Sequence, residues 1–198
     1  MTNRTDNARR GRWILVTLFA IFFVPLAVAT GWYALAPGYT PPPSPNGELI
    51  DPPQPLEPFT ARTAAGEPIE LETLRGRWHL VHVIRGDCDD TCRRRLYHTR
   101  QVRDALGEDR SRLVRLAVVD GGAEAPGIAS ELERHPRLRI LPAADAPDLL
   151  RQLPGVDDAS TVFLVDPLGN LMMRFPAALE PGAMLDDLEK LLKLSRIG

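Results

Sequence analysis

The sequence predicts an α/β domain with three layers and a central mixed sheet, preceded by one transmembrane helix. Residues 13–36 carry no charge and, as a helix, are long enough to cross a bilayer core of about 30 Å. From residue 59 onward, apolar runs typical of buried strands alternate with helical patterns, and a hairpin and a final helix follow. The chain of 198 residues is 44% hydrophobic, which suits one domain plus an appendage. Its net charge of -2 gives no reason to expect nucleic acid as a partner.

The charges around the apolar run predict its orientation in a membrane. Several arginines precede the run, namely Arg4, Arg9, Arg10 and Arg12. Glu48 is the first charged residue after it. By the positive-inside rule, residues 1–12 form a cytoplasmic tail and residues 13–36 a single transmembrane helix. The rule places the remaining domain on the periplasmic side of the inner (cell) membrane.

A cleaved signal peptide is the main alternative to an uncleaved anchor. Ala34-Leu35-Ala36 would supply its small-residue cleavage site. The apolar stretch is longer than a usual signal core, which favours the anchor. A buried core helix is disfavoured because no face of the segment is polar.

Prolines crowd the segment that follows the apolar run. Nine of the 19 prolines lie between Pro37 and Pro58. Because proline fixes φ and removes a hydrogen-bond donor, we expect residues 37–58 to form an extended linker without packed structure. At a polyproline rise of about 3.1 Å per residue, such a linker reaches tens of Å. A disordered spacer fits the same composition.

The predicted domain, residues 59–198, alternates strand and helix patterns. The expected strands are a short one within 66–71, buried ones at 78–84, 113–119 and 161–165, and a hairpin partner at 171–175. The expected helices lie at 91–106, 128–134 and 146–153, with an amphipathic helix from Pro181. Gly107 suits a helix C-cap, and 167–170 suits a tight turn.

The only two cysteines of the chain, Cys88 and Cys92, are separated by three residues. They follow the strand at 78–84 where the chain enters a helix, at the edge where open α/β sheets carry their chemistry. Cys92 falls in the first helical turn, where unpaired N–H groups favour a thiolate. Outside the cytoplasm such a pair forms a disulfide. A permanent staple would constrain the unfolded chain little because its loop is so short, so a working redox pair is favoured.

Further motifs surround the cysteines. The run G-E-P-I-E-L-E-T-L-R-G-R-W (66–78) precedes the strand that leads to them. In the second half, Val156-Asp157-Asp158 is followed by Phe163-Leu164, Pro167 and Gly169. With the three-residue cysteine spacing, this layout over about residues 59–195 resembles the SCO/SenC branch of the thioredoxin-like superfamily.

The resemblance implies a thioredoxin-like fold, a membrane anchor and a role in maturation of cytochrome c oxidase. Proteins of this branch serve the copper centre of oxidase subunit II, as copper carriers or as thiol reductants. Cys88 and Cys92 would be the redox-active centre and would transiently hold Cu(I). An oxidase subunit or another assembly factor would be the partner.

Two positions depart from the pattern of the branch. Asp158 stands where the family has its copper-binding histidine, and Arg93 replaces a proline after the second cysteine. Cu(I) is soft and prefers thiolate, thioether or imidazole ligands, so a carboxylate is a poor third ligand. The resemblance therefore predicts a dithiol role first, with copper only as an additional cargo and no certain cofactor.

Other soft donors in the chain are expected to be structural. The four histidines are His79, His82, His98 and His135. The first two are three apart in one strand and so face opposite sides, and His98 lies six residues past Cys92 on the helix. Met172 and Met173 are expected to fill the core.

Two alternative functions remain open. A general membrane-anchored thiol-disulfide reductase would be a thiol-disulfide oxidoreductase of broad specificity. Against it, residues 158–161 lack the proline that such enzymes place before the strand facing the cysteines, and Asp87 rather than tryptophan precedes Cys88. A non-catalytic adaptor that only docks to oxidase subunits is the other alternative.

Overall fold

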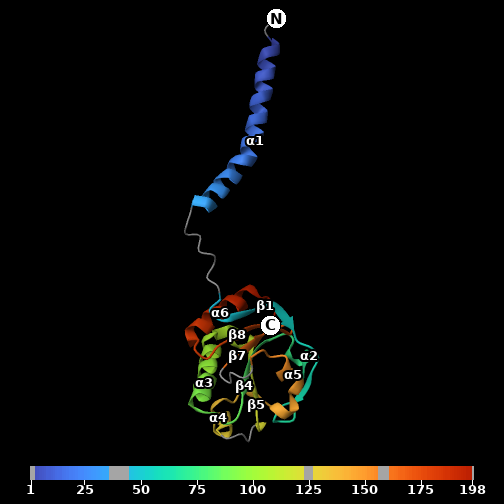
Figure 1. Cartoon of the computed structure of the whole chain (residues 1–198), viewed down its shortest axis with the longest axis vertical. Helices are drawn as coiled ribbons and strands as arrows, with labels where there is room; N and C mark the ends of the chain where they lie inside the picture. The colour runs from blue at the N-terminus through green and yellow to red at the C-terminus, as the bar shows by residue number, and fades with distance from the viewer. Residues whose placement is uncertain (1–2, 36–44, 123–126, 156–160, 198) are drawn as a thin grey trace. The chain divides into compact units, whose positions relative to one another are not determined.

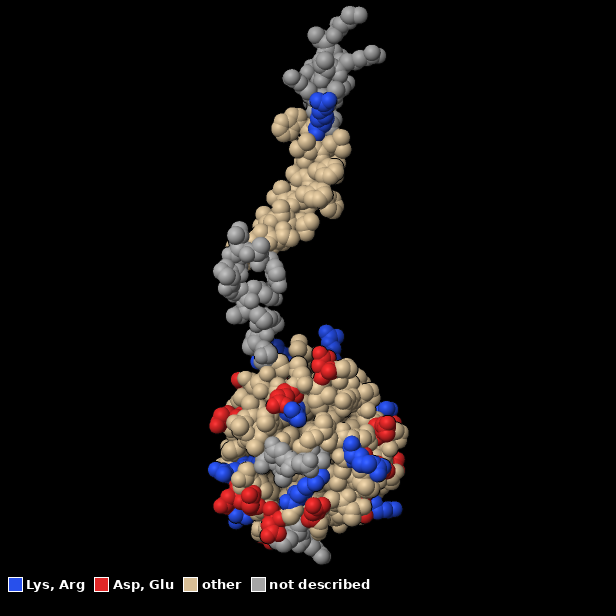
Figure 2. All heavy atoms as spheres, in the orientation of Figure 1, with Lys and Arg blue, Asp and Glu red and all other residues tan. Residues whose placement is uncertain are grey.

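The structure is a computed structural model that describes residues 3–35, 45–122, 127–155 and 161–197. It divides into two compact units, Met1–Ser44 and Pro45–Gly198. The first consists of helix α1 (Asn3–Leu35), whose stretch Arg12–Trp32 has a mean hydropathy of 2.4. In Figure 2 the stretch is tan, without charged side chains, beyond the arginine at its start. The helix fits the predicted membrane anchor by length and composition, as a signal sequence would also do.

The second unit is built on one mixed sheet of six strands (Figure 1). The strands are β1 (Glu48–Pro55), β4 (Trp78–Ile84), β5 (Leu113–Val119), β6 (Leu138–Pro142), β7 (Val162–Val165) and β8 (Asn170–Phe175). Their order is β1-β8-β7-β4-β5-β6. Strands β4, β5 and β6 are mutually parallel, and β4 with β7, β7 with β8 and β8 with β1 pair antiparallel. The predicted mixed sheet is confirmed.

Helices cover both faces of this sheet (Figure 1). They are α2 (Leu71–Leu74), α3 (Asp90–Ala105), α4 (Ile128–Arg134), α5 (Pro147–Arg151) and α6 (Pro181–Leu194), with 3-10 turns η1 (Gly107–Arg112) and η3 (Ala143–Asp145). A small hairpin, β2 (Thr60–Arg62) and β3 (Pro68–Glu70), lies outside the main sheet. The three predicted layers are thus present. The sequence patterns missed β2 and β6, the latter an edge strand.

Strand β4 is buried along its whole length. Leu80 belongs to the apolar cluster formed with α3 and α6, whereas Val81 and Val83 belong to the cluster formed with α2 and α5. Successive side chains of a strand point to opposite faces, so a strand covered on both faces is apolar at nearly every position. This is why residues 78–84 read as one continuous apolar run.

The prediction of an unpacked linker over 37–58 is wrong for residues 48–55. These residues form β1, which pairs with β8 at Glu48↔Arg174, Leu49↔Met173, Gln54↔Leu171 and Pro55↔Asn170. Residues 37–44 lie outside the described residues. The compact domain therefore begins near Pro45 rather than at 59.

Position in the sheet explains why a proline-rich segment can be a strand. Strand β1 lies at the edge of the sheet, so one side of it needs no partner. Its pairing register shifts between Leu49 and Gln54, and Pro52 and Pro53 fall inside that irregularity. Prolines are tolerated at sheet edges and bulges because they cannot donate to a ladder. Composition alone identifies the prolines but not this placement.

A buried carboxylate fixes the start of the domain to its last helix. Asp187 on α6 is 2% exposed. Its oxygens accept hydrogen bonds from the backbone N–H of Gly47 at 2.8 Å and of Asn46 at 3.1 Å, and from the Asn46 side chain at 3.0 Å. Gly47 also lies so close to Phe175 that a Cβ there would be 2.6 Å from the ring. Only glycine permits this approach.

We expect Asp187→Ala to destabilise the domain by about 1–3 kcal/mol, because it leaves buried donors without an acceptor. Urea unfolding, followed through the buried Trp78, measures the change. Asp186→Ala removes the same charge from the exposed neighbouring position and should cost under about 0.5 kcal/mol. Equal losses in the two variants would contradict the role given to Asp187.

Candidate functional site

The two cysteines are joined by a disulfide, with their Cα atoms 5.2 Å apart. Cys88 follows the end of β4 and is 2% exposed, packed in an apolar cluster with Ile84 and Leu96. Cys92 lies in the first turn of α3, as predicted, and is half-buried. Cys88 is therefore covered by the core, whereas Cys92 is only partly buried.

Asp89 determines where α3 begins. Its backbone is extended, and its carboxylate accepts a hydrogen bond from the Cys92 N–H at 2.9 Å. An aspartate at this position satisfies a donor that the helix itself leaves free. The accessible cysteine is thus held at a helix N-terminus by a side chain three residues before it.

Arg93 connects the two ends of the cysteine loop. Its Nη1 donates to the Cys88 carbonyl oxygen at 2.8 Å, and its guanidinium also pairs with Asp90. The bond to the Cys88 carbonyl links the first turn of α3 to the loop before it, while the Asp90 carboxylate is largely exposed.

Gly127 completes the wall beside Cys88. Its φ is +79°, and a Cβ at this position would lie 2.8 Å from the Cys88 carbonyl oxygen. Because the obstacle is backbone, a larger residue would force the loop to move. Sequence reasoning missed this residue, since its only signal is a glycine before a helical pattern.

The histidines do not gather around the disulfide. His79, His82 and His135 are buried, and His98 is half-buried on α3. His82 Nε2 lies 3.1 Å from the Thr99 hydroxyl, and His79 Nδ1 lies 3.0 Å from the Arg77 carbonyl oxygen. Within the described ranges, no group of three or more His, Cys, Asp or Glu side chains could hold a metal ion.

Burial favours the neutral form of the three buried histidines. It lowers the pKa of His79 to about 4, against a smaller opposite effect of the Arg77 carbonyl. Burial, followed by repulsion from Arg115 and Arg95, also holds the pKa of His82 well below its usual value. The pKa of His135 is also lowered, again mainly by burial. Met173 is buried and Met172 packs against its cluster, as expected of core residues.

Among the described residues, the site could supply two thiolate ligands for Cu(I). Reduction of the disulfide would supply Cys88 and Cys92 as soft ligands, which Cu(I) prefers. The residue expected at the third position, Asp158, lies outside the described residues. The described site residues therefore support a role in dithiol-disulfide chemistry more strongly than a role in metal binding.

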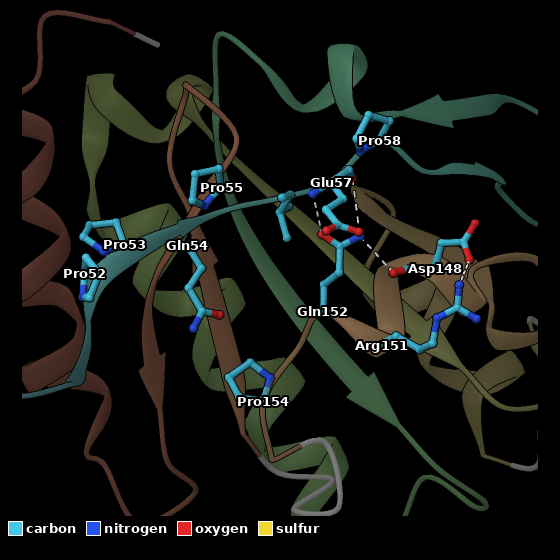
Figure 3. A pocket seen from close by; sticks show the side chains of 11 residues that line it. Pro52, Pro53, Gln54, Pro55, Glu57, Pro58, Asp148, Arg151, Gln152 and Pro154 are labelled. Atoms are coloured by element: carbon cyan, nitrogen blue, oxygen red, sulfur yellow. Dashed lines mark hydrogen bonds and ion pairs between the residues drawn. The ribbon is translucent and has the colours of Figure 1, made fainter.

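A cavity of about 890 Å³ lies elsewhere in the domain, and neither cysteine lines it. Figure 3 shows its lining by β1, residues 56–58 and the region of α5. Gln152 points toward Glu57, whose N–H donates to its side-chain oxygen, and Arg151 pairs with Asp148. Its lining residues include no cysteine or histidine, so they offer no thiolate or imidazole ligand to a soft metal.

Comparison with known proteins gives the fold a family. Residues 78–195 match the family described as transmembrane-like, thioredoxin-like, C-terminal domain. The chain belongs to this family. The matched segment contains the strand that leads to the cysteines, the disulfide itself and the closing helix. No curated protein matches the chain.

Solved structures share the fold at low sequence identity. Copper-bound yeast Sco1 is 18% identical with a TM-score of 0.61, covering 72% of this chain and 95% of that chain. Copper-bound ScoI of Bradyrhizobium japonicum is 18% identical with a TM-score of 0.54, covering 69% and 98%. The thioredoxin domain of a Bacteroides vulgatus thiol-disulfide oxidoreductase is 17% identical with a TM-score of 0.52, covering 70% and 96%. The predicted thioredoxin-like fold and structural likeness to SCO proteins are confirmed.

We expect acid to destabilise the domain through His79. Its pKa is about 4 in the folded domain and near 6.5 when unfolded. Between these values the unfolded chain binds a proton that the folded domain does not, so stability is lost as the pH falls below about 6.5. At about pH 5 the loss from this residue is about 2 kcal/mol.

Urea unfolding at neutral pH and at about pH 5 tests this linkage. The unchanged protein should lose about 2 kcal/mol more on acidification than the His79→Gln variant. His98→Gln, at a half-buried position on α3, should behave like the unchanged protein. If H79Q loses as much stability as the unchanged protein, His79 is not held neutral by the fold.

Proposed function

We propose that this chain is a membrane-anchored, SCO-like thiol-disulfide protein that assists maturation of cytochrome c oxidase through Cys88 and Cys92. The observation that carries the proposal is the disulfide at the junction of β4 and α3, in which Cys88 is buried and Cys92 is only partly buried. Its fold is similar to those of copper-bound Sco1 and of a thiol-disulfide oxidoreductase. An oxidase subunit or another assembly factor is the proposed partner.

The difference in exposure assigns different roles to the two sulfurs. In the reduced protein, the Cys92 thiolate attacks one sulfur of a partner disulfide and forms a mixed disulfide, releasing one partner thiol. The Cys88 thiolate then attacks the Cys92 sulfur, which closes the Cys88–Cys92 bond and releases the second partner thiol. Two electrons and two protons pass from the pair to the partner. Cys88, being covered, meets only the neighbouring sulfur.

Helix α1 and the charges before it support the proposed compartment. Arginines precede the apolar stretch and the domain follows it, so the proposed topology is a single-pass inner-membrane protein with its domain in the periplasm. Disulfides form and persist on that side of the membrane. An uncleaved helix would keep the redox pair near membrane-bound partners.

Copper is proposed as cargo rather than as a resident cofactor. When reduced, the two thiolates could receive Cu(I) and pass it to a site with more ligands. Asp158, at the position of the family's histidine, would contribute hard oxygen and little affinity. Weak retention of Cu(I) suits a protein that acts chiefly as a reductant.

A general disulfide reductase is the second candidate, favoured by the likeness to the Bacteroides vulgatus oxidoreductase. Such an enzyme would reduce many unrelated disulfides, whereas an oxidase assembly factor would act on few. The non-catalytic adaptor makes a different prediction. A Cys88→Ser/Cys92→Ser double variant would then restore oxidase maturation in cells that lack the protein.

We expect the Cys88–Cys92 disulfide to open and close reversibly. Thiol trapping across a redox titration should show both forms, with the change at potentials reached by ordinary dithiol buffers. The loop has few residues, so the bond resists reduction less than a long-range structural bridge would. If the pair stays oxidised in strongly reducing buffer, the disulfide is a permanent structural bond and not a redox centre.

Single variants test the roles of the two sulfurs. Cys88→Ser removes the resolving sulfur and leaves Cys92 at the surface, so mixed disulfides with partners should accumulate. Cys92→Ser leaves only the covered Cys88, so few should form. Equal trapping by both variants would reject the assignment of Cys92 as the attacking residue.

We also expect Asp158→His to raise the affinity for Cu(I). An imidazole would add a suitable ligand to two thiolates, with a gain on the order of tenfold or more. Asp158→Ala should change the affinity little. Copper titrations of the three reduced proteins distinguish these outcomes. If the histidine gives no gain, Asp158 does not occupy the third-ligand position.

A further inference from the structure

A second pocket, of about 290 Å³, lies between α3, β5 and the end of α4. It is lined by Arg100, Arg103, Asp104, Arg115, His135, Pro136 and Arg137. We call it the arginine pocket. It holds four guanidinium groups and a single carboxylate. None of its residues belongs to the cysteine loop, so the pocket requires its own explanation.

Arg115 is the least expected member of this pocket. It lies in the parallel strand β5 and is only 2% exposed. Its Nε donates to the Thr99 hydroxyl at 3.1 Å and its Nη2 to the Leu96 carbonyl at 2.7 Å, and both acceptors are neutral. Among the residues that the structure describes, no carboxylate forms an ion pair with it.

A buried cation without a counter-charge is costly. Burial, then repulsion from Arg103 and Arg100, lowers the pKa of Arg115 to about 10, so the group is still charged at neutral pH. Buried charges in proteins are usually paired, because desolvation costs several kcal/mol per ion. The neighbouring Arg103 and Arg100 add positive charge, which the carboxylate of Asp104 opposes only in part.

The remaining lining supplies donors but little negative charge. Asp104 lies 3.7 Å from Arg100 and 3.8 Å from Arg103, which are long distances shared by one carboxylate. Arg137 is exposed. His135 is 3% exposed, and its Nδ1 has no hydrogen-bond partner among the described residues. Arg100 and Arg103 each donate one hydrogen bond to a backbone carbonyl, at 2.6 Å and 2.8 Å. His135 Nε2 lies 3.5 Å from the buried carboxylate of Glu131, which also pairs with Arg134. The lining itself still carries more positive than negative charge.

From this lining we propose that the arginine pocket binds a phosphate group, either as free phosphate or on an anionic lipid headgroup. Guanidinium groups match phosphate oxygens with paired N–H donors, and charge-assisted bonds of this type are strong. The lining has four guanidinium cations and one carboxylate, and His135 is neutral. The positive charge that remains is more than a ligand with one negative charge would balance, and it suits a dianion. The volume is adequate for one phosphate group and its nearest substituents.

Binding of radiolabelled inorganic phosphate to the full chain in neutral detergent tests the free-phosphate source. Equilibrium dialysis at ionic strength matched with chloride should show saturable binding. Arg137→Gln should weaken it about tenfold, the scale of one charge-assisted hydrogen bond. Arg115→Gln should weaken it at least as much, if that variant folds. Arg62→Gln removes the same charge from an exposed position on β2 and should leave binding unchanged.

The lipid source is tested with the full chain in nanodiscs and phosphate-free buffer. Phosphatidylglycerol mixed into phosphatidylcholine should then raise the melting temperature of the unchanged protein and of R62Q, but not of R137Q. Either result supports the proposal that the arginine pocket binds a phosphate group, and it shows whether the ligand is free phosphate or a lipid headgroup. If neither ligand acts, or if R62Q and R137Q lose the effect equally, the proposal is overturned.

Discussion

Burial of β4 on both faces is the constraint on which the rest of the domain depends. The strand pairs with β5 on one side and β7 on the other, and helices cover it above and below. A strand in this position has no access to solvent until it ends. The first residues that can carry chemistry are therefore those just past Ile84, where the cysteine loop begins.

The position of the cysteine loop after β4 explains why its two cysteines differ in burial. Cys88 still belongs to the apolar cluster beneath α3, whereas Cys92 has already entered the helix. Three neighbours hold the loop from different directions, since Asp89 caps the helix, Arg93 binds the loop carbonyl and Gly127 lies against it. The difference in burial between Cys88 and Cys92 thus follows from the packing of the loop and the start of α3.

The features that could be predicted from the sequence are those encoded locally. The apolar run at 78–84, the helix after it and the cysteine spacing each depend on neighbouring residues, and the structure places them as expected. Strand β1 could not be predicted in this way, because its prolines are acceptable only at a sheet edge against β8. Gly127 and Arg115 derive their importance from residues distant in sequence. Local patterns carry no information about such partners.

The hydrogen bonds of Asp187 also have a mechanical consequence. Residues Asn46 and Gly47 lie at the start of the compact unit that begins at Pro45, and they are held by a carboxylate on the last helix. Tension arriving along the backbone from the N-terminal side is therefore borne by α6 and the β1–β8 edge. The loop of Cys88 and Cys92, attached to β4 in the middle of the sheet, is shielded from that load. A force applied at the N-terminal side of the domain would in this way leave the geometry of the cysteine loop unchanged.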